Sequence, residues 1–324
     1  MEYRKLISFG KNSYVISLPK AWLSQNKIQK GDLIHLDESG PNLILSRREQ
    51  SKSSPEKRKV INVDGKSIHL IKREVNSAYI LNNHTIVLKG EETRINIKNL
   101  QNIFQNLIAL EVMEQTSNTI VAKDFLNMET VSVEEIIRKM DMVVRTMFKE
   151  SCQAFSDENY ENINERDNDV NRLYYLLHRT VLYNLDNPLK ALKNFKLMPI
   201  DLMSYLFTGF FLEGAADEVR RTIRFARLMK LNEVKEKQMI NFLVKVYAFY
   251  LETMKAVYNR DVELGLKLLP NKVDLNLELD EFEKTNHALP NCGSTIGRIR
   301  KLISYIHSLG RTIYQGFNYY ADEA

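Results

Sequence analysis

The chain has 324 residues, of which 44% are hydrophobic and 27% charged, and its formal net charge at pH 7 is +5. This composition is that of a globular protein and differs from disordered, collagen-like or disulfide-rich chains. The two cysteines form no CxxC pair, so neither a disulfide framework nor a thiolate zinc site is expected. No apolar run has the length of a membrane span and the start has no signal-peptide core, so we expect a cytoplasmic protein without membrane insertion.

The positive charge is concentrated in the first 60 residues. They contain 12 Lys and Arg against 6 Asp and Glu, whereas the other 264 residues are nearly neutral, with 34 against 35. A local surplus of cations attracts phosphate backbones because binding releases condensed counterions. The alternative is a solvated basic segment without a partner.

Residues 1–48 predict a small module of strands with one short helix. The order is strand, turn, strand, short helix, tight turn, strand, turn and strand, with Pro19 in the first turn of the helix and Gly31 in the tight turn. A module of this size is too small to bury a stable core alone, so we expect two copies to pair.

The middle of the chain predicts a linker followed by a small α/β domain. Residues 49–59 are polar and lack periodicity, which indicates a linker. In residues 60–128 we expect a hairpin at an Asp-Gly turn, further strands and one helix. The expected strands are 60–63, 68–71, 85–88, 94–97 and 119–122, and the expected helix contains Ile103, Leu107, Leu110 and either Met113 or Glu114.

Residues 129–324 predict a helical domain. Apolar residues recur every three or four positions in several stripes, of which Ile296, Ile299, Ile303 and Ile306 form the clearest. Prolines 188, 199, 270 and 290 each mark a helix boundary, because proline cannot continue a helix interior. We expect two groups of helices, at about 131–230 and 233–320.

Two carboxylates in this domain need a compensating charge. Glu213 and Asp217 are four residues apart and therefore share one helix face, where like charges destabilise the helix. A metal ion with oxygen ligands is one solution. The other is an ion-paired face, because Arg220 and Arg221 follow Asp217 at the required spacing.

The sequence contains no recognisable catalytic motif. It has no P-loop, no GxGxxG after a strand, no HExxH and no nucleophile elbow. The six histidines are scattered, and none is four residues from another. We therefore expect that the protein is not an enzyme.

Four segments of the first module carry a family resemblance: Phe9-Gly10-Lys11-Asn12-Ser13-Tyr14, Ile16-Ser17-Leu18-Pro19-Lys20-Ala21-Trp22, Lys30-Gly31-Asp32 and Leu43-Ile44-Leu45. In these segments the module resembles the AbrB/SpoVT family of swapped-hairpin DNA-binding domains. The resemblance implies that two chains interleave their hairpins into one β-barrel, whose basic face binds the major groove of double-stranded DNA. The candidates for that face are Arg4, Lys5, Lys11, Asn12, Ser13, Lys20, Arg47 and Arg48. The alternative is a dimerisation barrel without DNA contact.

Acidic motifs carry a second resemblance. Leu212-Glu213-Gly214-Ala215-Ala216-Asp217 and the segment 167–174 are similar to the acidic motifs of PhoU, the phosphate-uptake regulator, although Asn171 replaces an expected Asp. The corresponding helix of the second half, Ile296-Gly297-Arg298-Ile299-Arg300, lacks the carboxylates. PhoU proteins bind multinuclear metal clusters, so the resemblance implies a divalent or iron-type metal ion at one partial site. The implied ligands are Asp167, Glu213 and Asp217, with Asp169 less favoured.

Together the two resemblances cover nearly the whole chain and match the arrangement of archaeal phosphate-uptake regulator homologues. The fold class predicted is multidomain and mainly α. Its parts are a swapped-hairpin β-barrel head at 1–48, a linker at 49–59, a small α/β domain at 60–128 and PhoU-like antiparallel helix bundles at 129–324. The function implied is a homodimeric, DNA-binding transcriptional regulator linked to phosphate uptake or to metal or phosphate status.

Two other functions stay open at this stage. One is a regulatory scaffold that docks on a phosphate transporter or a sensor kinase and uses the head only to dimerise. The other is a metal-storage or metal-sensing bundle.

Overall fold

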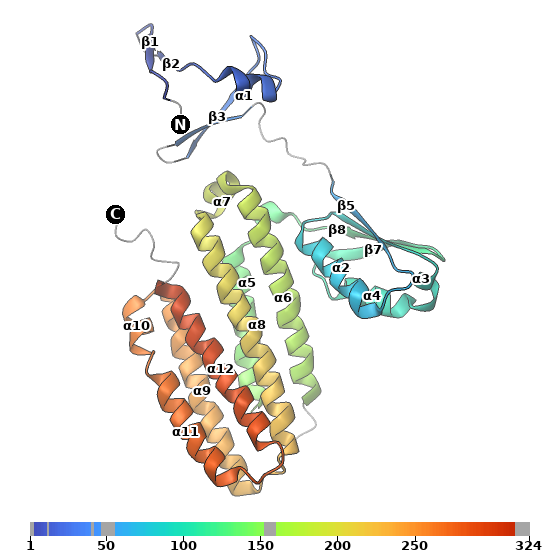
Figure 1. The fold of residues 1–324 in the computed structure, drawn as a ribbon, viewed down its shortest axis with the longest axis vertical. Coiled ribbons are helices and arrows are strands. Elements are labelled where there is room, and N and C mark those ends of the chain that lie inside the picture. The colour runs from blue at the N-terminus through green and yellow to red at the C-terminus, as the bar shows by residue number, and fades with distance from the viewer. Residues whose placement is uncertain (1–2, 12, 40–41, 47–55, 152–159, 315–324) are drawn as a thin grey trace. The chain divides into compact units, whose positions relative to one another are not determined.

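The computed structural model describes residues 3–11, 13–39, 42–46, 56–151 and 160–314. The chain divides into two compact units, Met1–Pro55 and Glu56–Ala324. Helices dominate the second unit, whereas the first consists mainly of short strands (Figure 1). The prediction of a mainly α protein of several parts is confirmed at this level.

The first unit consists of two antiparallel hairpins around one short helix. Its elements are β1 (Ile7–Phe9), β2 (Ser13–Val15), α1 (Lys20–Gln25), β3 (His35–Ser39) and β4 (Asn42–Ser46). β1 pairs with β2 and β3 with β4. Gly10 has φ 72° and Gly31 has φ 96°, which is the left-handed region that glycine enters without a steric penalty. The element order predicted from the sequence is confirmed.

No residue of the first unit whose burial is described is buried within the chain. Leu33 is 90% exposed and Phe9 69%, and helix α1 buries no residue. The large apolar side chains exposed in this unit are Tyr3, Leu6, Ile7, Phe9, Tyr14, Val15, Ile16, Leu33, Leu36 and Leu43. Within one copy, the residues of this unit with described burial therefore form no apolar core of the kind that stabilises a folded domain.

The second unit begins with an α/β domain. Its elements are β5 (Arg58–Asn62), α2 (Ile68–Ile80), β6 (Thr85–Lys89), α3 (Glu92–Ile95), α4 (Ile97–Gln105), β7 (Leu110–Gln115) and β8 (Thr119–Asp124). The sheet order is β5-β6-β8-β7, with β5 and β6 parallel and the other pairs antiparallel. Helix α2 is the crossover that a parallel pair requires. Its side chains form a separate core with the sheet and α4, which includes Tyr79 and Phe104.

Three elements predicted for this domain are wrong. Residues 68–71 open helix α2 and do not form a strand, because Ser67 caps the helix by accepting a hydrogen bond from the backbone N–H of Leu70. Residues 94–97 belong to α3 and α4, whose junction is Asn96. The helix expected through Met113 ends at Gln105, and Leu110–Gln115 forms β7. Strand β5 also begins at Arg58, inside the predicted linker.

The rest of the second unit is the helical body. It contains a 3₁₀ turn, η1 (Met128–Thr130), and the helices α5 (Val133–Ser151), α6 (Tyr160–Asp186), α7 (Pro188–Phe195), α8 (Pro199–Leu228), α9 (Glu233–Asn259), α10 (Val262–Lys267), α11 (Asn271–Asn286) and α12 (Cys292–Thr312). Each predicted proline boundary is confirmed: Pro188 and Pro199 are the first residues of α7 and α8, and Pro270 and Pro290 lie between two helices. One continuous hydrophobic core includes buried side chains of α5 to α9, α11 and α12, and partly buried side chains of α10 pack against it. Helix α8 lies centrally, in contact with α5, α6 and α12 (Figure 1).

Among the residues described, no single helix is both long enough and apolar enough to cross a membrane. Helices α7 and α8 reach that length and composition only together, with a bend of 81° between them.

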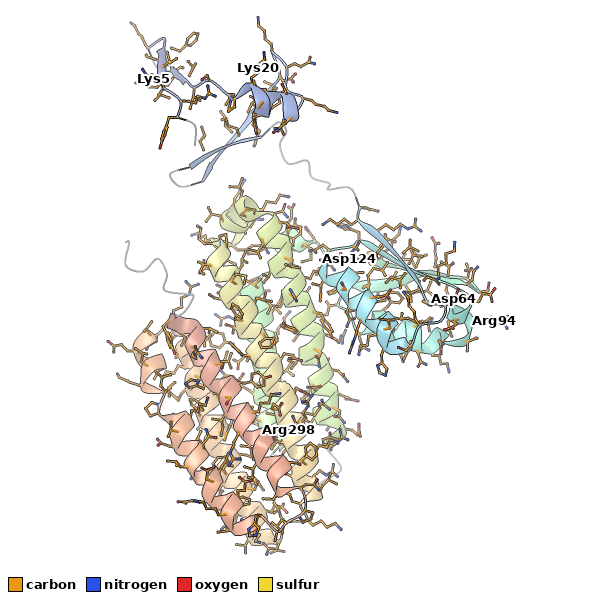
Figure 2. All side chains as sticks on the ribbon, in the orientation of Figure 1. Lys5, Lys20, Asp64, Arg94, Asp124 and Arg298 are labelled. Atoms are coloured by element: carbon orange, nitrogen blue, oxygen red, sulfur yellow. The ribbon has the colours of Figure 1, made fainter. Side chains whose placement is uncertain are left out.

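A buried arginine joins the α/β domain to the helical body. Arg179 of α6 is 0% exposed and forms an ion pair with Asp124. Asp124 is the last residue of β8 and is labelled in Figure 2. Its Nε donates a hydrogen bond of 2.9 Å to Oδ1 of Asn82, and its guanidinium lies 4.6 Å from the ring centre of Tyr79. Burial raises the pKa of the Tyr79 hydroxyl to about 12, and this hydroxyl donates to the backbone carbonyl of Ile108. The guanidinium is thus held from three sides.

Removing this guanidinium tests how strongly the junction depends on it. We expect Arg179→Met to lower the free energy of unfolding by about 3–5 kcal/mol, because it leaves the Asp124 carboxylate buried without a partner. The double variant Arg179→Met with Asp124→Leu should recover most of this loss. Urea denaturation followed by circular dichroism measures both.

The pair of Lys190 and Glu129, which is accessible to solvent, provides the control. Lys190→Met should change the free energy of unfolding by less than about 1 kcal/mol. If Arg179→Met had an equally small effect, the buried pair would not stabilise the junction.

Candidate nucleic-acid interface and acidic cluster

The candidate DNA-binding residues lie on the first unit. Arg4, Lys5, Lys11, Ser13 and Lys20 are all exposed. The other three candidates, Asn12, Arg47 and Arg48, lie outside the residues that the structure describes.

Local geometry explains where these side chains are placed. Phe9 pairs with Ser13 across the first hairpin, so Lys11 lies in the turn between the strands. Lys20 is the first residue of α1, and Figure 2 marks it together with Lys5, which precedes β1. The described cations thus come from the segment before β1, the turn of the first hairpin and the first residue of α1. Exposed cations can contact phosphates, whose recognition fixes register without reading sequence.

The predicted acidic motif is found between helices α6 and α8, where arginines neutralise it. Nε of Arg220 lies 3.1 Å from Oδ2 of Asp167, and its Nη2 lies 2.6 Å from Oδ1 of Asp217. Nη2 of Arg221 lies 2.8 Å from the other oxygen of Asp217. The structure thus brings Asp167 and Asp217 together through one guanidinium.

A fourth carboxylate, which the sequence reading did not single out, belongs to the same cluster. Glu218 is 0% exposed, and its Oε1 lies 2.9 Å from Nζ of Lys301 and 3.5 Å from Nη1 of Arg298 on α12. Figure 2 marks Arg298 on this helix. Two basic residues of α12 therefore lie against this buried carboxylate. The only signal in the sequence was the position of Glu218, directly after the motif.

The donor set at this cluster fits ion pairing better than metal binding. The guanidinium of Arg220 lies between the two carboxylates that a metal ion would bridge. Asp169 is exposed and lies 3.6 Å from Arg172, and the amide of Asn171 donates to the backbone oxygen of Asp167. Within the described ranges, no group of three or more His, Cys, Asp or Glu is arranged to hold a metal ion. The metal ion stays a prediction.

Glu213 differs from the other carboxylates of the cluster. It forms no ion pair with any residue that the structure describes. Burial raises the pKa of its carboxyl to about 7, and the neighbouring charges of Asp217 and Asp167 add to the effect. Burial also raises the pKa of Asp167. The cluster therefore contains a carboxyl group that changes its charge near neutral pH.

A second polar network, which sequence reasoning missed, links α5 to α9. Asp141 accepts hydrogen bonds of 2.6 Å from the hydroxyl of Tyr250 and 2.8 Å from that of Tyr258. Nε of Arg145, one turn later on α5, lies 2.9 Å from the same carboxylate. Only the pair of Asp141 and Arg145 has a signal in the sequence, at i and i+4, because Tyr250 lies 109 residues away and Tyr258 lies 117 residues away. The network is fully engaged and stabilises the bundle.

No family model matches the chain, and neither a curated protein nor a solved structure matches it. The two resemblances therefore rest on the quoted residues alone.

The raised pKa of Glu213 predicts a pH dependence of stability. An unfolded Glu titrates near 4.5, whereas the folded carboxyl titrates near 7. Between these values the folded protein holds a proton that the unfolded chain has released, so stability falls as the pH rises through this window. In Glu213→Gln we expect the free energy of unfolding to decrease by about 1–2 kcal/mol less over this pH window than in the wild type. Urea denaturation at several pH values between 4.5 and about 8 measures it.

The matched control is Asp169→Asn, which alters an exposed carboxylate near the cluster and should retain the pH dependence of the wild type. An equal slope for Glu213→Gln and the wild type would contradict the raised pKa. Loss of stability in Glu213→Gln at a pH above this window would favour a metal ligand.

Proposed function

We propose that the chain is a dimeric, DNA-binding transcriptional regulator. The head, residues 1–48, pairs with a second copy and binds double-stranded DNA. The helical body acts as the sensor or interaction module, and the regulation is linked to phosphate uptake or to metal or phosphate status. The proposal places the protein in the cytoplasm, where the DNA is.

The main support for the proposal is the exposed apolar surface of the head. Ile7, Phe9 and Leu36 lie on regular strands, yet each is more than half exposed in a single copy. Burying a side chain of this size contributes about 1.5–3 kcal/mol, so a second copy that covers several of them stabilises both. Pairing is therefore the arrangement in which this sequence gains a core.

The charge of the head supports DNA as its partner. The first 60 residues hold the whole positive excess of the chain, while the remaining residues are nearly neutral. Dimerisation doubles this charge on one small module, and a concentrated cationic surface is the electrostatic footprint of a nucleic-acid-binding protein. The link to phosphate depends on the PhoU resemblance alone.

Removing two of the candidate cations tests DNA binding. We expect Arg4→Ala with Lys11→Ala to weaken binding to every duplex sequence. The slope of log K against log salt should decrease by about one for each phosphate that the variant no longer neutralises. Fluorescence anisotropy with labelled duplexes over a salt series measures both quantities.

The control removes two cations from the body: Lys255→Ala with Lys267→Ala, both in exposed pairs. This variant has the same net charge as the variant of the head, but it should bind DNA like the wild type. Equal losses of DNA affinity in both variants would show that binding depends on the net charge alone and not on the positions of the cations. Absence of duplex binding by a dimeric wild type would favour the scaffold, with the head used only to dimerise.

Pairing through the head gives a separate prediction. We expect the full chain to be a dimer by light scattering coupled to size exclusion, and Ile7→Asp with Phe9→Asp to make it monomeric, because both charges would enter the interface. Val234→Asp, at an exposed apolar position of α9, is the control and should stay dimeric. A monomeric wild type at micromolar concentration would contradict the proposal.

A further inference from the structure

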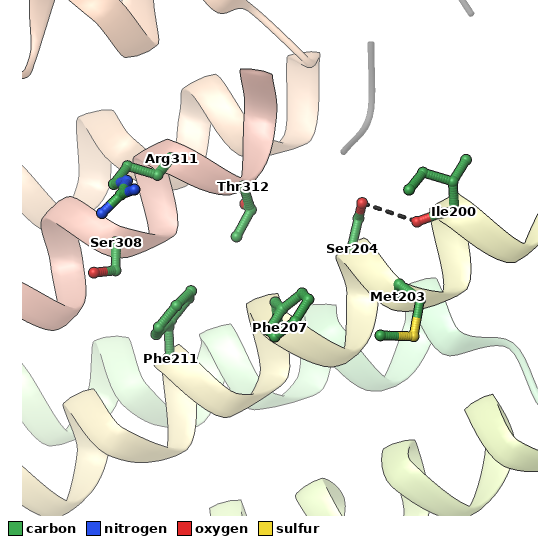
Figure 3. A pocket seen from close by; sticks show the side chains of 8 residues that line it. All are labelled: Ile200, Met203, Ser204, Phe207, Phe211, Ser308, Arg311 and Thr312. Carbon is green, nitrogen blue, oxygen red and sulfur yellow. Dashed lines mark hydrogen bonds between the residues drawn. The ribbon is translucent and has the colours of Figure 1, made fainter. Parts of the chain in front are cut away.

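A cavity opens between helices α8 and α12 in the helical body. Its volume is about 290 Å³, which corresponds to roughly ten water molecules at the density of the liquid. Figure 3 shows its lining, with Ile200, Met203, Ser204, Phe207 and Phe211 on α8 facing Ser308, Arg311 and Thr312 on α12. A site of this size between helices of a bundle suits a small organic molecule.

The α8 wall of the cavity is largely apolar and its side chains are accessible. Phe207 is 50% exposed and Met203 36%, although both belong to a helix that is otherwise packed at the centre of the body. The hydroxyl of Ser204 donates to the carbonyl of Ile200, so it has a partner and does not need a ligand (Figure 3). This wall therefore offers aromatic and aliphatic surface to a ligand.

The α12 wall contributes a positive charge. Arg311 lines the cavity, no Asp or Glu does, and Arg311 forms no ion pair with a residue that the structure describes. Lys272 and Arg311 both act on His307, whose pKa is lowered first by burial and then by these two charges. Cationic side chains thus gather at this end of α12 without a carboxylate in the cavity wall.

We propose that this cavity is a binding site for a small organic anion with an apolar body. The apolar part of the ligand packs against Phe207, Phe211 and Met203, and its carboxylate, sulfonate or phosphate group pairs with the guanidinium of Arg311. Guanidinium is the side-chain group best matched to such anions, because its N–H groups form two parallel hydrogen bonds with them. The site lies wholly in the helical body, so it stands whether or not the head binds DNA.

The experiment uses the full chain and naphthalene sulfonate as the probe. Isotope-labelled methionine methyl groups report binding, and the signal of Met203 is assigned from its absence in Met203→Leu. We expect a saturable shift of this signal that is lost in Ser308→Phe, which fills the cavity. Arg311→Gln should weaken the affinity at least about tenfold, because it removes the charge-assisted hydrogen bonds to the anion.

Two comparisons separate recognition of the anion from a structural effect. Naphthalene methanol has the same apolar body without the charge, and its affinity should be the same in Arg311→Gln and the wild type. Arg224→Gln removes a guanidinium from the exposed surface of α8, outside the cavity, and should bind the sulfonate like the wild type. Equal weakening of both probes by Arg311→Gln, or no shift of Met203, would overturn the proposal. A Met203 signal that changes with protein concentration alone would place a second copy in the cavity and also overturn it.

Discussion

The arrangement of the second unit depends on the buried ion pair between Arg179 and Asp124. Both side chains are almost wholly inaccessible, and a buried charge is tolerated only when it is paired and hydrogen-bonded. Arg179 belongs to the long helix α6, while its partners Asp124, Asn82 and Tyr79 all belong to the α/β domain. The guanidinium therefore keeps its partners only if the α/β domain stays against helix α6, which agrees with the two parts forming one compact unit.

Helix α8 carries both the acidic cluster and one wall of the cavity. Along one stretch, Asp217 and Glu218 are neutralised by arginines of the same helix and by basic residues of α12. Glu213 lies beside them and titrates near neutral pH because burial and its acidic neighbours oppose its charge. Closer to its N-terminus, the same helix lines the cavity together with Arg311 of α12. A ligand in the cavity and the protonation of the cluster would therefore act on the same pair of helices.

The two units of the chain differ in how much apolar surface they bury. The second unit has two hydrophobic cores of its own. The first unit has strands, turns and a helix in the predicted order, yet none of its residues with described burial is buried. Hydrogen bonds within a hairpin contribute little net free energy, because water offers the same bonds to the unfolded chain. The described part of the head thus shows no apolar core of its own, which is the reason that we propose a second copy as its partner.

Local patterns in the chain were enough to define the order of elements in the head, the strands β6 and β8, and the helix boundaries at prolines, because turn residues, alternation and proline act within a few residues. Short apolar runs were ambiguous, and residues 68–71 became a helix because Ser67 caps it and α2 packs its buried side on the sheet. The acidic motif could also be located from its spacing. The spacing did not decide whether arginines or a metal ion compensate its charge. Only the packed fold shows that Arg179 meets Asp124 from 55 residues away and that Asp141 meets Tyr250 from 109 residues away. The spacing of apolar residues in the sequence determines which face of a helix or strand is apolar. The partner of a buried charge is determined only when elements that are distant in the sequence pack together.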